Sequence, residues 1–300
     1  MSKNIFNELS EAMANAAENA GKYTVMVDAR RRIPASGVAI SKDIILTAGH
    51  VVEREEDIKI LFGDGKETIA RLIGRDPGTD IAVLKLDSAV AVPAEIAKPS
   101  ARVGQFVLAI ARPSANGIES SFGTVNKLGG PVRTGRGGML EKYIKTDVVS
   151  YPGFSGGPLI NGEGEMYGIN TSGFGMGGEA VTIPTDLAFK IADALAKHGK
   201  IKRGYIGVRS QTVNLPENAK SQLNREQANG LLLVGIEKDS PAEKGGLMIG
   251  DILVGVAGAA VEHHDELFTR LSGDVVGKST PMDVLRGGKL QSVSVVVGER

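Results

Sequence analysis

The sequence predicts a mostly β protein that begins with a helix and ends with a smaller α+β module. Short β-like runs, separated by turn residues, fall into two series between residues 24 and 183. The 40 glycines of the 300-residue chain suit tight turns between such strands. After residue 203, strand-like runs alternate with helical segments. The length and this change of pattern together predict two domains.

The N-terminal segment, residues 4–20, has the periodicity of an amphipathic helix. Apolar residues recur at helical spacing along one face, and Gly21 suits the position after the last turn. This face predicts either a helix packed on its own domain or a contact between subunits built around Phe6. The residues of the face are Phe6, Leu9, Met13, Ala16, Ala17 and Ala20.

The first β series predicts one six-stranded antiparallel unit. Its turns are charged or rich in glycine, as at residues 63–66. A connector rich in proline and alanine follows the series, over Val90–Pro99. The runs are Thr24–Val27, Gly37–Ile40, Ile44–Thr47, Ile58–Phe62, Thr68–Ile73 and Ile81–Leu86.

The second β series leads into a helix over Thr185–His198, with Thr185 as its N-cap and Gly199 at its end. Two Gly-rich segments, Gly129–Gly138 and Ser172–Gly178, interrupt the series and are predicted to be mobile loops. The runs are Phe106–Ala111, Ser121–Lys127, Tyr143–Val148, Leu159–Ile160, Met166–Thr171 and Ala180–Ile183.

A short linker is predicted at residues 200–203, between a first domain over 1–199 and a second over 204–300. Helices are expected in the second domain near Pro241–Gly246 and Asp265–Leu271. Its β-like runs are Tyr205–Arg209, Gly230–Ile236, Asp251–Val256, Thr280–Arg286 and Ser292–Val297.

Composition excludes several function classes. Lys plus Arg and Asp plus Glu number 35 each, so the chain has no basic footprint for nucleic acid. The absence of cysteine removes thiolate metal sites and cysteine nucleophiles, and no metal or cofactor is expected. No apolar run is long enough to predict a membrane span. Without a signal-peptide core the chain as written predicts a cytoplasmic protein, or a periplasmic or exported one if the N-terminus has been shortened.

Three side chains have the types and settings that covalent hydrolysis requires. Ser155 lies in a Gly-rich turn, where Gly153 and Ser155 offer backbone N–H groups two residues apart for an oxyanion hole. His50 follows one β-like run and Asp80 precedes another, so that the carboxylate can orient the imidazole. The order His, Asp, Ser along the chain is that of a chymotrypsin-type serine protease.

Other interpretations of these residues are weaker. His198 ends a helix, where a cation is favoured by the dipole, and His263 and His264 lie in the C-terminal module. Residues 153–157 also match the G-x-S-x-G nucleophile elbow. That elbow requires a helix after the serine, and the Gly-Gly-Pro sequence after Ser155 opposes one.

Three segments closely resemble the catalytic blocks of the HtrA/Deg serine proteases: Thr47–Val52, Asp76–Lys85 and Gly153–Leu159. The resemblance covers nearly the whole chain. It implies a chymotrypsin-like double six-stranded antiparallel β-barrel followed by a PDZ domain. It also implies that His50 is the base, Asp80 its orienting acid and Ser155 the nucleophile. The implied activity is ATP-independent endoproteolysis of unfolded or damaged proteins by a homotrimer or a multiple of trimers.

The chain departs from the family pattern in several places, including a short Asp28–Pro34 segment where some members have a long loop. Phe154 and Tyr151 stand where the family usually has asparagine, and Arg112–Ala115 replaces an Asn-Pro-Phe-Gly-like segment. None of these changes removes a catalytic group. Phe154 is expected at the rim of the specificity pocket, so the departures concern substrate preference.

The resemblance also assigns an uncharged S1 pocket. It places Val149 at the base, Phe154 at the rim, and Ile169, Asn170 and Thr171 along a wall. An apolar pocket would desolvate a Lys or Arg side chain without pairing it. We therefore predict a preference for small to medium aliphatic residues at P1.

The segment Gly204–Val208 resembles the carboxylate-binding loop of a PDZ domain, to which a peptide C-terminus binds as an added strand. Leu267 and Leu271 lie one helical turn apart and either line the peptide groove or belong to the core. The residues implied in the groove are Tyr205, Ile206, Gly207, Val208, Leu267 and Leu271.

Two hypotheses of function follow. The first is a quality-control endopeptidase regulated by PDZ peptide binding and by the Gly-rich loops. The second is a peptide-binding holdase chaperone or scaffold whose protease site is latent. The intact set of His50, Asp80 and Ser155 favours the first, because an unused site has no physical reason to keep all three groups.

Overall fold

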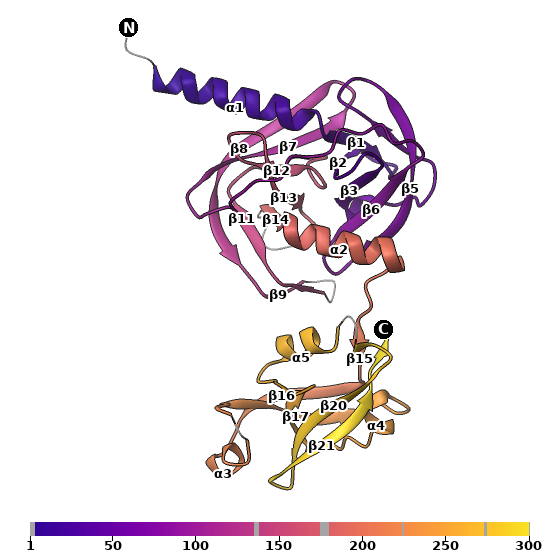
Figure 1. Cartoon of the computed structure of the whole chain (residues 1–300), viewed down its shortest axis with the longest axis vertical. Coiled ribbons are helices and arrows are strands. Elements are labelled where there is room, and N and C mark those ends of the chain that lie inside the picture. Colours follow the sequence, from indigo (N-terminus) through magenta and orange to yellow (C-terminus); the bar gives the residue numbers. More distant parts are fainter. Residues whose placement is uncertain (1–3, 135–137, 175–179, 224, 273–274, 300) are drawn as a thin grey trace. The chain divides into compact units, whose positions relative to one another are not determined.

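The computed structural model describes residues 4–134, 138–174, 180–223, 225–272 and 275–299. The chain divides into two compact units, Met1–Ile201 and Lys202–Arg300 (Figure 1). Parts of the two Gly-rich segments, residues 135–137 and 175–178, lie outside the described residues, so their predicted mobility is not assessed.

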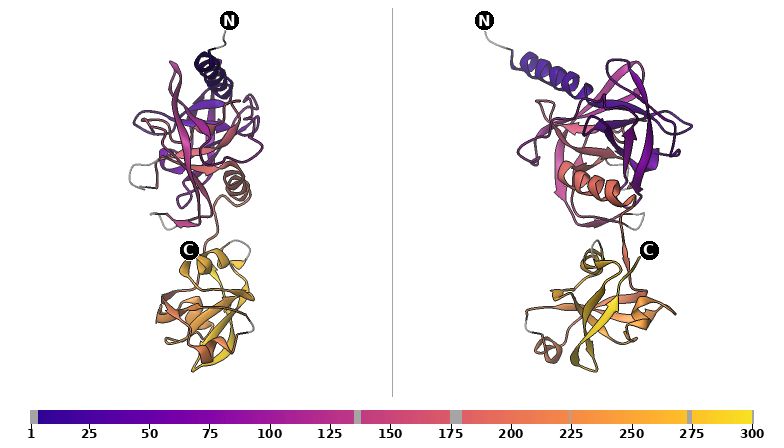
Figure 2. Two further views of the ribbon diagram at one scale, coloured as in Figure 1. Left: turned by 90° about the vertical axis from the view of Figure 1, so that its left-hand side faces the viewer. Right: turned by 45° about the vertical axis from the view of Figure 1, so that its right-hand side comes forward.

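Helix α1 (Ile5–Gly21) begins after the N-cap Asn4, whose side chain accepts a hydrogen bond from the Phe6 N–H. Its C-terminal half packs on the first unit, where Ala16 and Ala20 are buried. Its N-terminal half extends away from the barrels in every view, and Phe6 is 83% exposed (Figures 1 and 2). The C-terminal half of the helix therefore packs on its own unit, as the first prediction expects. The N-terminal half leaves Phe6 uncovered by the described chain, so a subunit contact there stays a prediction.

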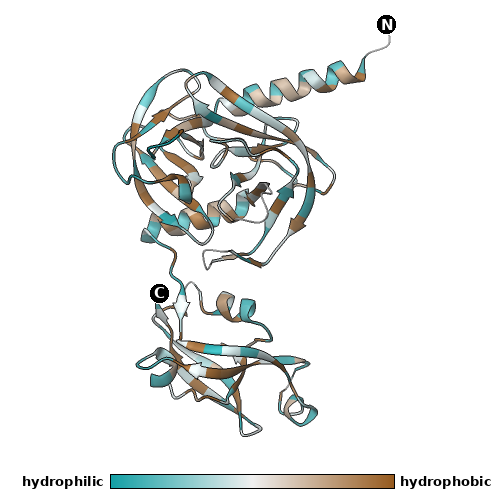
Figure 3. Cartoon of the chain, turned by 180° about the vertical axis from the view of Figure 1, so that it is seen from behind, coloured by the Kyte–Doolittle hydropathy of each residue, from teal (hydrophilic) through white to brown (hydrophobic). Residues whose placement is uncertain are grey.

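The first β series forms a closed six-stranded antiparallel barrel, in the order β1-β2-β3-β6-β5-β4. Its inward-facing residues include Val25, Ile45 and Leu84, all fully buried. Apolar residues recur along the strands of this barrel and of the second (Figure 3). The strands are β1 (Thr24–Asp28), β2 (Ala35–Ala39), β3 (Ile44–Ala48), β4 (Ile58–Leu61), β5 (Glu67–Asp76) and β6 (Ile81–Leu86).

The second β series closes in the same way, in the order β11-β14-β13-β12-β7-β8, which confirms the predicted double barrel. A small hairpin, β9 (Val132–Arg133) with β10 (Met139–Leu140), lies partly within a segment that the sequence predicted as loop alone. The barrel strands are β7 (Phe106–Ser114), β8 (Gly117–Gly129), β11 (Tyr143–Thr146), β12 (Pro158–Ile160), β13 (Met166–Thr171) and β14 (Ala180–Pro184).

Helix α2 (Thr185–His198) packs against strands of both barrels. Leu187, Ile191 and Leu195 join one core cluster with residues of both barrels, so the helix fixes the barrels against each other. The predicted N-cap role of Thr185 is wrong: Pro184 is the N-cap, and the Thr185 hydroxyl bonds instead to the Met166 carbonyl at 3.3 Å.

The second unit is built on a sheet with strand order β16-β17-β18-β20-β21, to which β19 (Ala259–Ala260) adds beside β18. Within the described residues of this unit, three short α-helices accompany the sheet, α3 (Glu217–Lys220), α4 (Pro241–Lys244) and α5 (His264–Arg270). Its core includes Leu231, Leu253 and Val284. The remaining strands are β15 (Gly204–Tyr205), β16 (Val208–Asn214), β17 (Asn229–Ile236), β18 (Ile252–Val256), β20 (Ser279–Arg286), β21 (Lys289–Val296) and β22 (Gly298–Glu299).

A buried ion pair joins two parts of the second unit. The Asp251 side chain is 1% exposed, and its two oxygens each accept a bond of 2.8 Å from the Arg286 guanidinium. The Met248 N–H donates a further bond of 2.8 Å. Burial by itself would raise the pKa of this carboxyl, but the Arg286 and Met248 hydrogen bonds outweigh burial and lower it.

Replacing Asp251 with asparagine should lower the free energy of unfolding of the second unit by about 2 kcal/mol, because the neutral amide weakens the charged hydrogen bonds that the buried carboxylate accepts. A carboxyl with a lowered folded pKa stabilises the protein above the ordinary carboxyl pKa, near 4, and loses that effect as pH falls. The difference between wild type and variant in chemical denaturation should therefore shrink below about pH 4. The exposed variant Glu226→Gln changes the same charge and should have little effect; an equal loss from both variants would contradict the role of the pair.

Candidate active site

Two neighbouring strands bring His50 and Asp80 together. Strand β3 ends at Ala48, and the short 3-10 turn Gly49–Val51 that follows carries His50. Strand β6 begins directly after Asp80, and Ala48 pairs with Ile81 in the sheet. The Gly49 N–H donates to the Asp80 carbonyl at 2.8 Å, which locks the two strand ends in this register.

The turn before β6 is shaped by a second carboxylate. Asp76 is buried and accepts bonds from the Thr79 N–H at 3.1 Å and the Thr79 hydroxyl at 2.6 Å. This local bonding is typical of an aspartate that opens a turn. The turn ends at Asp80, whose φ of +56° lies in the left-handed region, which aspartate adopts more readily than most residues.

The carboxylate of Asp80 holds His50 through two bonds, one to the imidazole and one to the backbone. One oxygen lies 2.7 Å from His50 Nδ1, and the other accepts the His50 backbone N–H at 2.8 Å. The Thr171 hydroxyl donates to the same oxygen as Nδ1. Asp80 is fully buried, while the His50 side chain is 18% exposed. A carboxylate bonded at Nδ1 places the proton there and leaves Nε2 as the proton acceptor.

Ser155 follows a tight turn over residues 151–154. The Phe154 N–H bonds to the Tyr151 carbonyl at 3.1 Å, Pro152 occupies the second position, and Gly153 has a φ of +91°. These are the features of a type II turn, whose third position requires a positive φ. A side chain at residue 153 would also come within 2.4 Å of Pro113, so both backbone and space select glycine.

Backbone hydrogen bonds hold several peptide groups around Ser155. The Ser155 carbonyl accepts from Ser36 N–H at 3.2 Å, the Gly156 N–H donates to the Asn170 carbonyl at 2.8 Å, and the Gly157 N–H donates to the Phe154 carbonyl at 3.1 Å. Within the described chain, the N–H groups of Gly153 and Ser155 have no acceptor. Two unpaired donors beside a serine are the donor set of an oxyanion hole.

Ser36 fastens this turn to the first barrel. Its buried hydroxyl donates to the Gly153 carbonyl at 2.8 Å and accepts the Arg112 N–H at 2.8 Å. With its backbone bond to Ser155, Ser36 thus contacts both residues that carry the free N–H groups. This role could not be predicted from the sequence, because no motif surrounds a serine within a buried strand.

Replacing Ser36 with alanine should lower kcat for peptide hydrolysis about tenfold and change KM less than twofold, because the loosened turn weakens the oxyanion hole without touching the substrate-binding surface. Ser41→Ala is the matched control, since Ser41 lies in the turn between β2 and β3 and its hydroxyl bonds to Asp43. Equal losses in both variants, or a change confined to KM, would refute this positioning role.

The Ser155 hydroxyl lies 3.0 Å from the hydroxyl of Ser172 and bonds to it rather than to His50. The next residue, Gly173, passes close to the other two candidates: a Cβ there would lie 2.3 Å from an Asp80 oxygen and 3.0 Å from His50 Nδ1. The segment after β13 therefore contacts all three candidate residues, and it has no room for a side chain at 173.

The residues assigned to the S1 pocket lie in different settings. Val149 is 52% exposed, whereas Ile169, Asn170 and Thr171 are buried. The expected place of Phe154 at the pocket rim is wrong, because the turn directs its ring into the core of the second barrel, where it is 1% exposed. Tyr151, half exposed, packs edge-on against it at 5.5 Å between ring centroids.

The residues assigned to the peptide groove of the second unit gather around its core. Gly207 has a φ of +77°, and a Cβ there would meet Ser240 at 2.3 Å. Val208 is partly buried, and the Tyr205 hydroxyl donates to Glu237. The fully packed members are Ile206, Leu267 and Leu271, each less than 5% exposed.

Two family models match the chain, a trypsin-like peptidase domain over residues 35–169 and a PDZ domain over residues 204–297. The solved HtrA-type protease AlgWS227A with a tripeptide is 30% identical with a TM-score of 0.80, and the match covers 96% of this chain and 97% of that chain. The chain belongs to the HtrA family of serine proteases. This confirms the family that three catalytic blocks predicted.

Other HtrA-like relatives agree. The serine endoprotease from Yersinia pestis is 29% identical with a TM-score of 0.78, over 96% of this chain and 98% of that one. The probable periplasmic DegP-like serine endoprotease of Halomonas elongata is 36% identical over 276 residues, which are 90% of this chain and 57% of the relative. The corresponding protein of Pseudomonas putida is 34% identical over 269 residues, 88% of this chain and 55% of the relative.

This HtrA chain thus spans just over half the length of those curated relatives. Their names place them in the periplasm and give no support to the cytoplasmic location predicted from the N-terminus. Across the described part of the chain, no helix is long and apolar enough to cross a membrane, and no cluster of three or more His, Asp or Glu side chains could hold a metal ion.

Proposed function

We propose that this chain is a serine endopeptidase in which Ser155 is the nucleophile, His50 the base and Asp80 the orienting acid. The observation that carries the proposal is the 2.7 Å bond from His50 Nδ1 to buried Asp80. Ser155, whose turn leaves two N–H groups without a described acceptor, is linked to this pair through Ser172 and Gly173. This arrangement combines base, orienting acid and oxyanion donors in one site.

In the proposed reaction, His50 Nε2 takes the Ser155 proton as Oγ bonds to the substrate carbonyl carbon. The N–H groups of Gly153 and Ser155 stabilise the resulting oxyanion. His50 then gives its proton to the leaving amine, the C–N bond breaks and an acyl-enzyme remains. A water molecule, deprotonated by His50, attacks the acyl carbon, and the proton returns to Ser155 as the acid product leaves.

The proposed substrates are unfolded or damaged proteins, cleaved without ATP. Peptide C-termini are proposed to bind the second unit. Its strand β16 is an edge strand of the described sheet, to which an extended peptide can add. His264 Nε2 lies 3.0 Å from the Ser210 hydroxyl and 3.1 Å from its carbonyl on β16, so a peptide that adds along this edge has to replace that contact.

A homotrimer, or a multiple of trimers, is proposed as the assembly. Its support within the chain is the exposed apolar start of α1, with Ile5 77% and Phe6 83% exposed. A monomeric soluble protein gains nothing from leaving such residues uncovered on a projecting helix. Action in the periplasm is proposed by analogy with the names of the relatives.

The experiment that tests the proposed function incubates the purified chain with β-casein, which lacks a stable fold, and with a folded protein, without nucleotide. We expect casein alone to be cut. Mass spectrometry of the products should find small to medium aliphatic residues at P1, because the residues assigned to S1 carry no charge. Preferred cleavage after Lys or Arg would refute the S1 assignment.

The second candidate, a peptide-binding chaperone or scaffold with a latent site, is favoured by one observation: Ser155 bonds to Ser172 instead of His50. Apo enzymes often have loose catalytic hydrogen bonds, so this contact suits a resting protease as well. Failure to cut casein, with or without peptides that bind the second unit, together with suppression of aggregation, would establish the scaffold function.

A further inference from the structure

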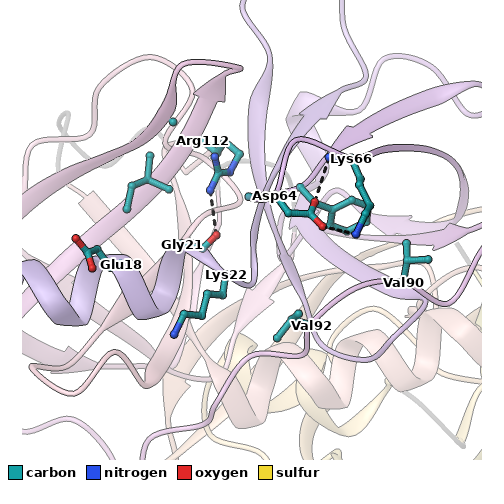
Figure 4. Close-up of a pocket in the computed structure, with 12 residues that line it drawn as sticks. Glu18, Gly21, Lys22, Asp64, Lys66, Val90, Val92 and Arg112 are labelled. Atoms are coloured by element: carbon teal, nitrogen blue, oxygen red, sulfur yellow. Dashed lines mark hydrogen bonds and ion pairs between the residues drawn. The ribbon is translucent and has the colours of Figure 1, made fainter.

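A cavity of about 520 Å³ lies in the first unit at the C-terminal end of α1 (Figure 4). Its volume is within the usual range for small-molecule sites, about 300–1,000 Å³. Four apolar side chains line it, and two of these, Val90 and Val92, are more than half exposed. The apolar lining is Phe62, Val90, Val92 and Ile118.

Arg112 lines this cavity and is only 7% exposed. Its Nε donates to the Thr24 carbonyl at 2.9 Å and its Nη2 to the Gly21 carbonyl at 3.0 Å, the latter at the end of α1 (Figure 4). These bonds account for its attachment to the helix. They leave Nη1, with two N–H donors, without an acceptor among the described residues.

No described carboxylate lies within ion-pairing distance of Arg112, although two line the same cavity. Asp64 is paired with Lys66 at 2.7 Å, and Glu18 makes no ion pair with a described residue. Burial lowers the pKa of the guanidinium, with no acid nearby to oppose it. A buried charge without a partner is costly, and a bound anion would remove that cost.

The chemistry of the walls defines the anion. An apolar lining favours a ligand with an apolar body, and the buried guanidinium, which has no ion pair among the described residues, favours an anion that accepts two N–H bonds. A carboxylate meets both requirements, whereas phosphate is more strongly hydrated and has no apolar part.

We propose that this cavity is a binding site for a small aliphatic carboxylic acid, whose carboxylate pairs with Arg112 and whose chain lies against Val90, Val92 and Ile118. The site is separate from the Ser155 region and does not depend on the proposed proteolysis. Arg112 nevertheless touches that region through its backbone, because its N–H holds Ser36, which in turn holds Gly153.

Isothermal titration of the full chain with octanoate tests the site. We expect saturable binding, and at least tenfold weaker binding of 1-octanol and of inorganic phosphate, since each has only one of the two required features. Arg112→Gln should weaken octanoate binding at least tenfold. A lack of saturable octanoate binding, or octanol binding as tightly as octanoate, would overturn the proposal.

A second variant covers the case that Arg112→Gln fails to fold. Val92→Asp places a carboxylate on the exposed wall and should weaken octanoate binding at least tenfold while leaving the Arg112 bonds in place. Val103→Asp is its matched control, because Val103 is 62% exposed and lies outside the lining. The proposal would be overturned if the two variants weakened octanoate binding equally. It would also be overturned if Val92→Asp changed the oligomeric mass and left octanoate binding unchanged.

Discussion

Replacing Ser155 with alanine should lower kcat for casein-derived peptides by about 10⁴-fold or more, because the variant loses the hydroxyl that is proposed to attack the substrate. The residual rate would come from substrate binding and the oxyanion donors alone. Steady-state kinetics with a quenched fluorescent peptide measures the loss, and thermal denaturation checks that the variant folds.

Ser172→Ala is the matched control for this prediction. It removes the only described side chain that bonds to the Ser155 hydroxyl, at 3.0 Å, but leaves the proposed nucleophile in place. Its kcat should stay within about threefold of wild type, because the transition state requires the bond to His50 instead. If Ser172→Ala were as inactive as Ser155→Ala, the two hydroxyls would have to act together, and the proposed roles would be wrong.

Replacing Asp80 with asparagine should lower kcat by about 10⁴-fold, the loss known for the same change in a Ser-His-Asp triad. Asp80 is fully buried and accepts hydrogen bonds from His50 N–H, His50 Nδ1 and the Thr171 hydroxyl. An amide that donates to Nδ1 would leave the proton on Nε2, where it blocks the base.

The control for Asp80→Asn is Asp87→Asn, an exposed aspartate just after strand β6. It changes the same charge in the same part of the barrel and should leave kcat unchanged. A bell-shaped or shifted pH profile in Asp80→Asn, with KM near wild type, would support an orienting role. Retention of more than a tenth of wild-type kcat would remove Asp80 from the mechanism.

The barrels and the three candidate residues could be predicted because their signals are local. Strands β6 and β13 have the predicted ends, since each is a short, almost wholly buried run that meets turn residues on both sides. His50 and Asp80 each stand next to a strand end, and antiparallel pairing of Ala48 with Ile81 brings them together. Such contacts follow from strand order alone.

The contacts that hold the site could not be predicted because they join distant parts of the chain. Ser36 reaches Gly153 across 117 residues, and Thr171 reaches Asp80 across 91. Thr171 was expected as a pocket wall, and its hydroxyl instead serves the buried carboxylate. The direction of the Phe154 ring depends on the positive φ of Gly153, which a sequence pattern does not reveal.

In the second unit, the sequence did not decide whether Leu267 and Leu271 line the peptide groove or belong to the core. Both are less than 5% exposed and belong to the main core cluster, as the core interpretation expects. Helical spacing marks an apolar face, but the same face can pack inward or receive a peptide, and only the surrounding strands decide between them.

The most direct test of the proposed site is the reaction of the purified chain with a fluorophosphonate, which modifies a serine hydroxyl only when a base activates it. Tryptic mass spectrometry should find the label on Ser155 in the wild-type chain and none in His50→Ala. Label on another serine, or equal labelling of Ser155 in both chains, would show that His50 does not activate Ser155 and would contradict the proposed mechanism.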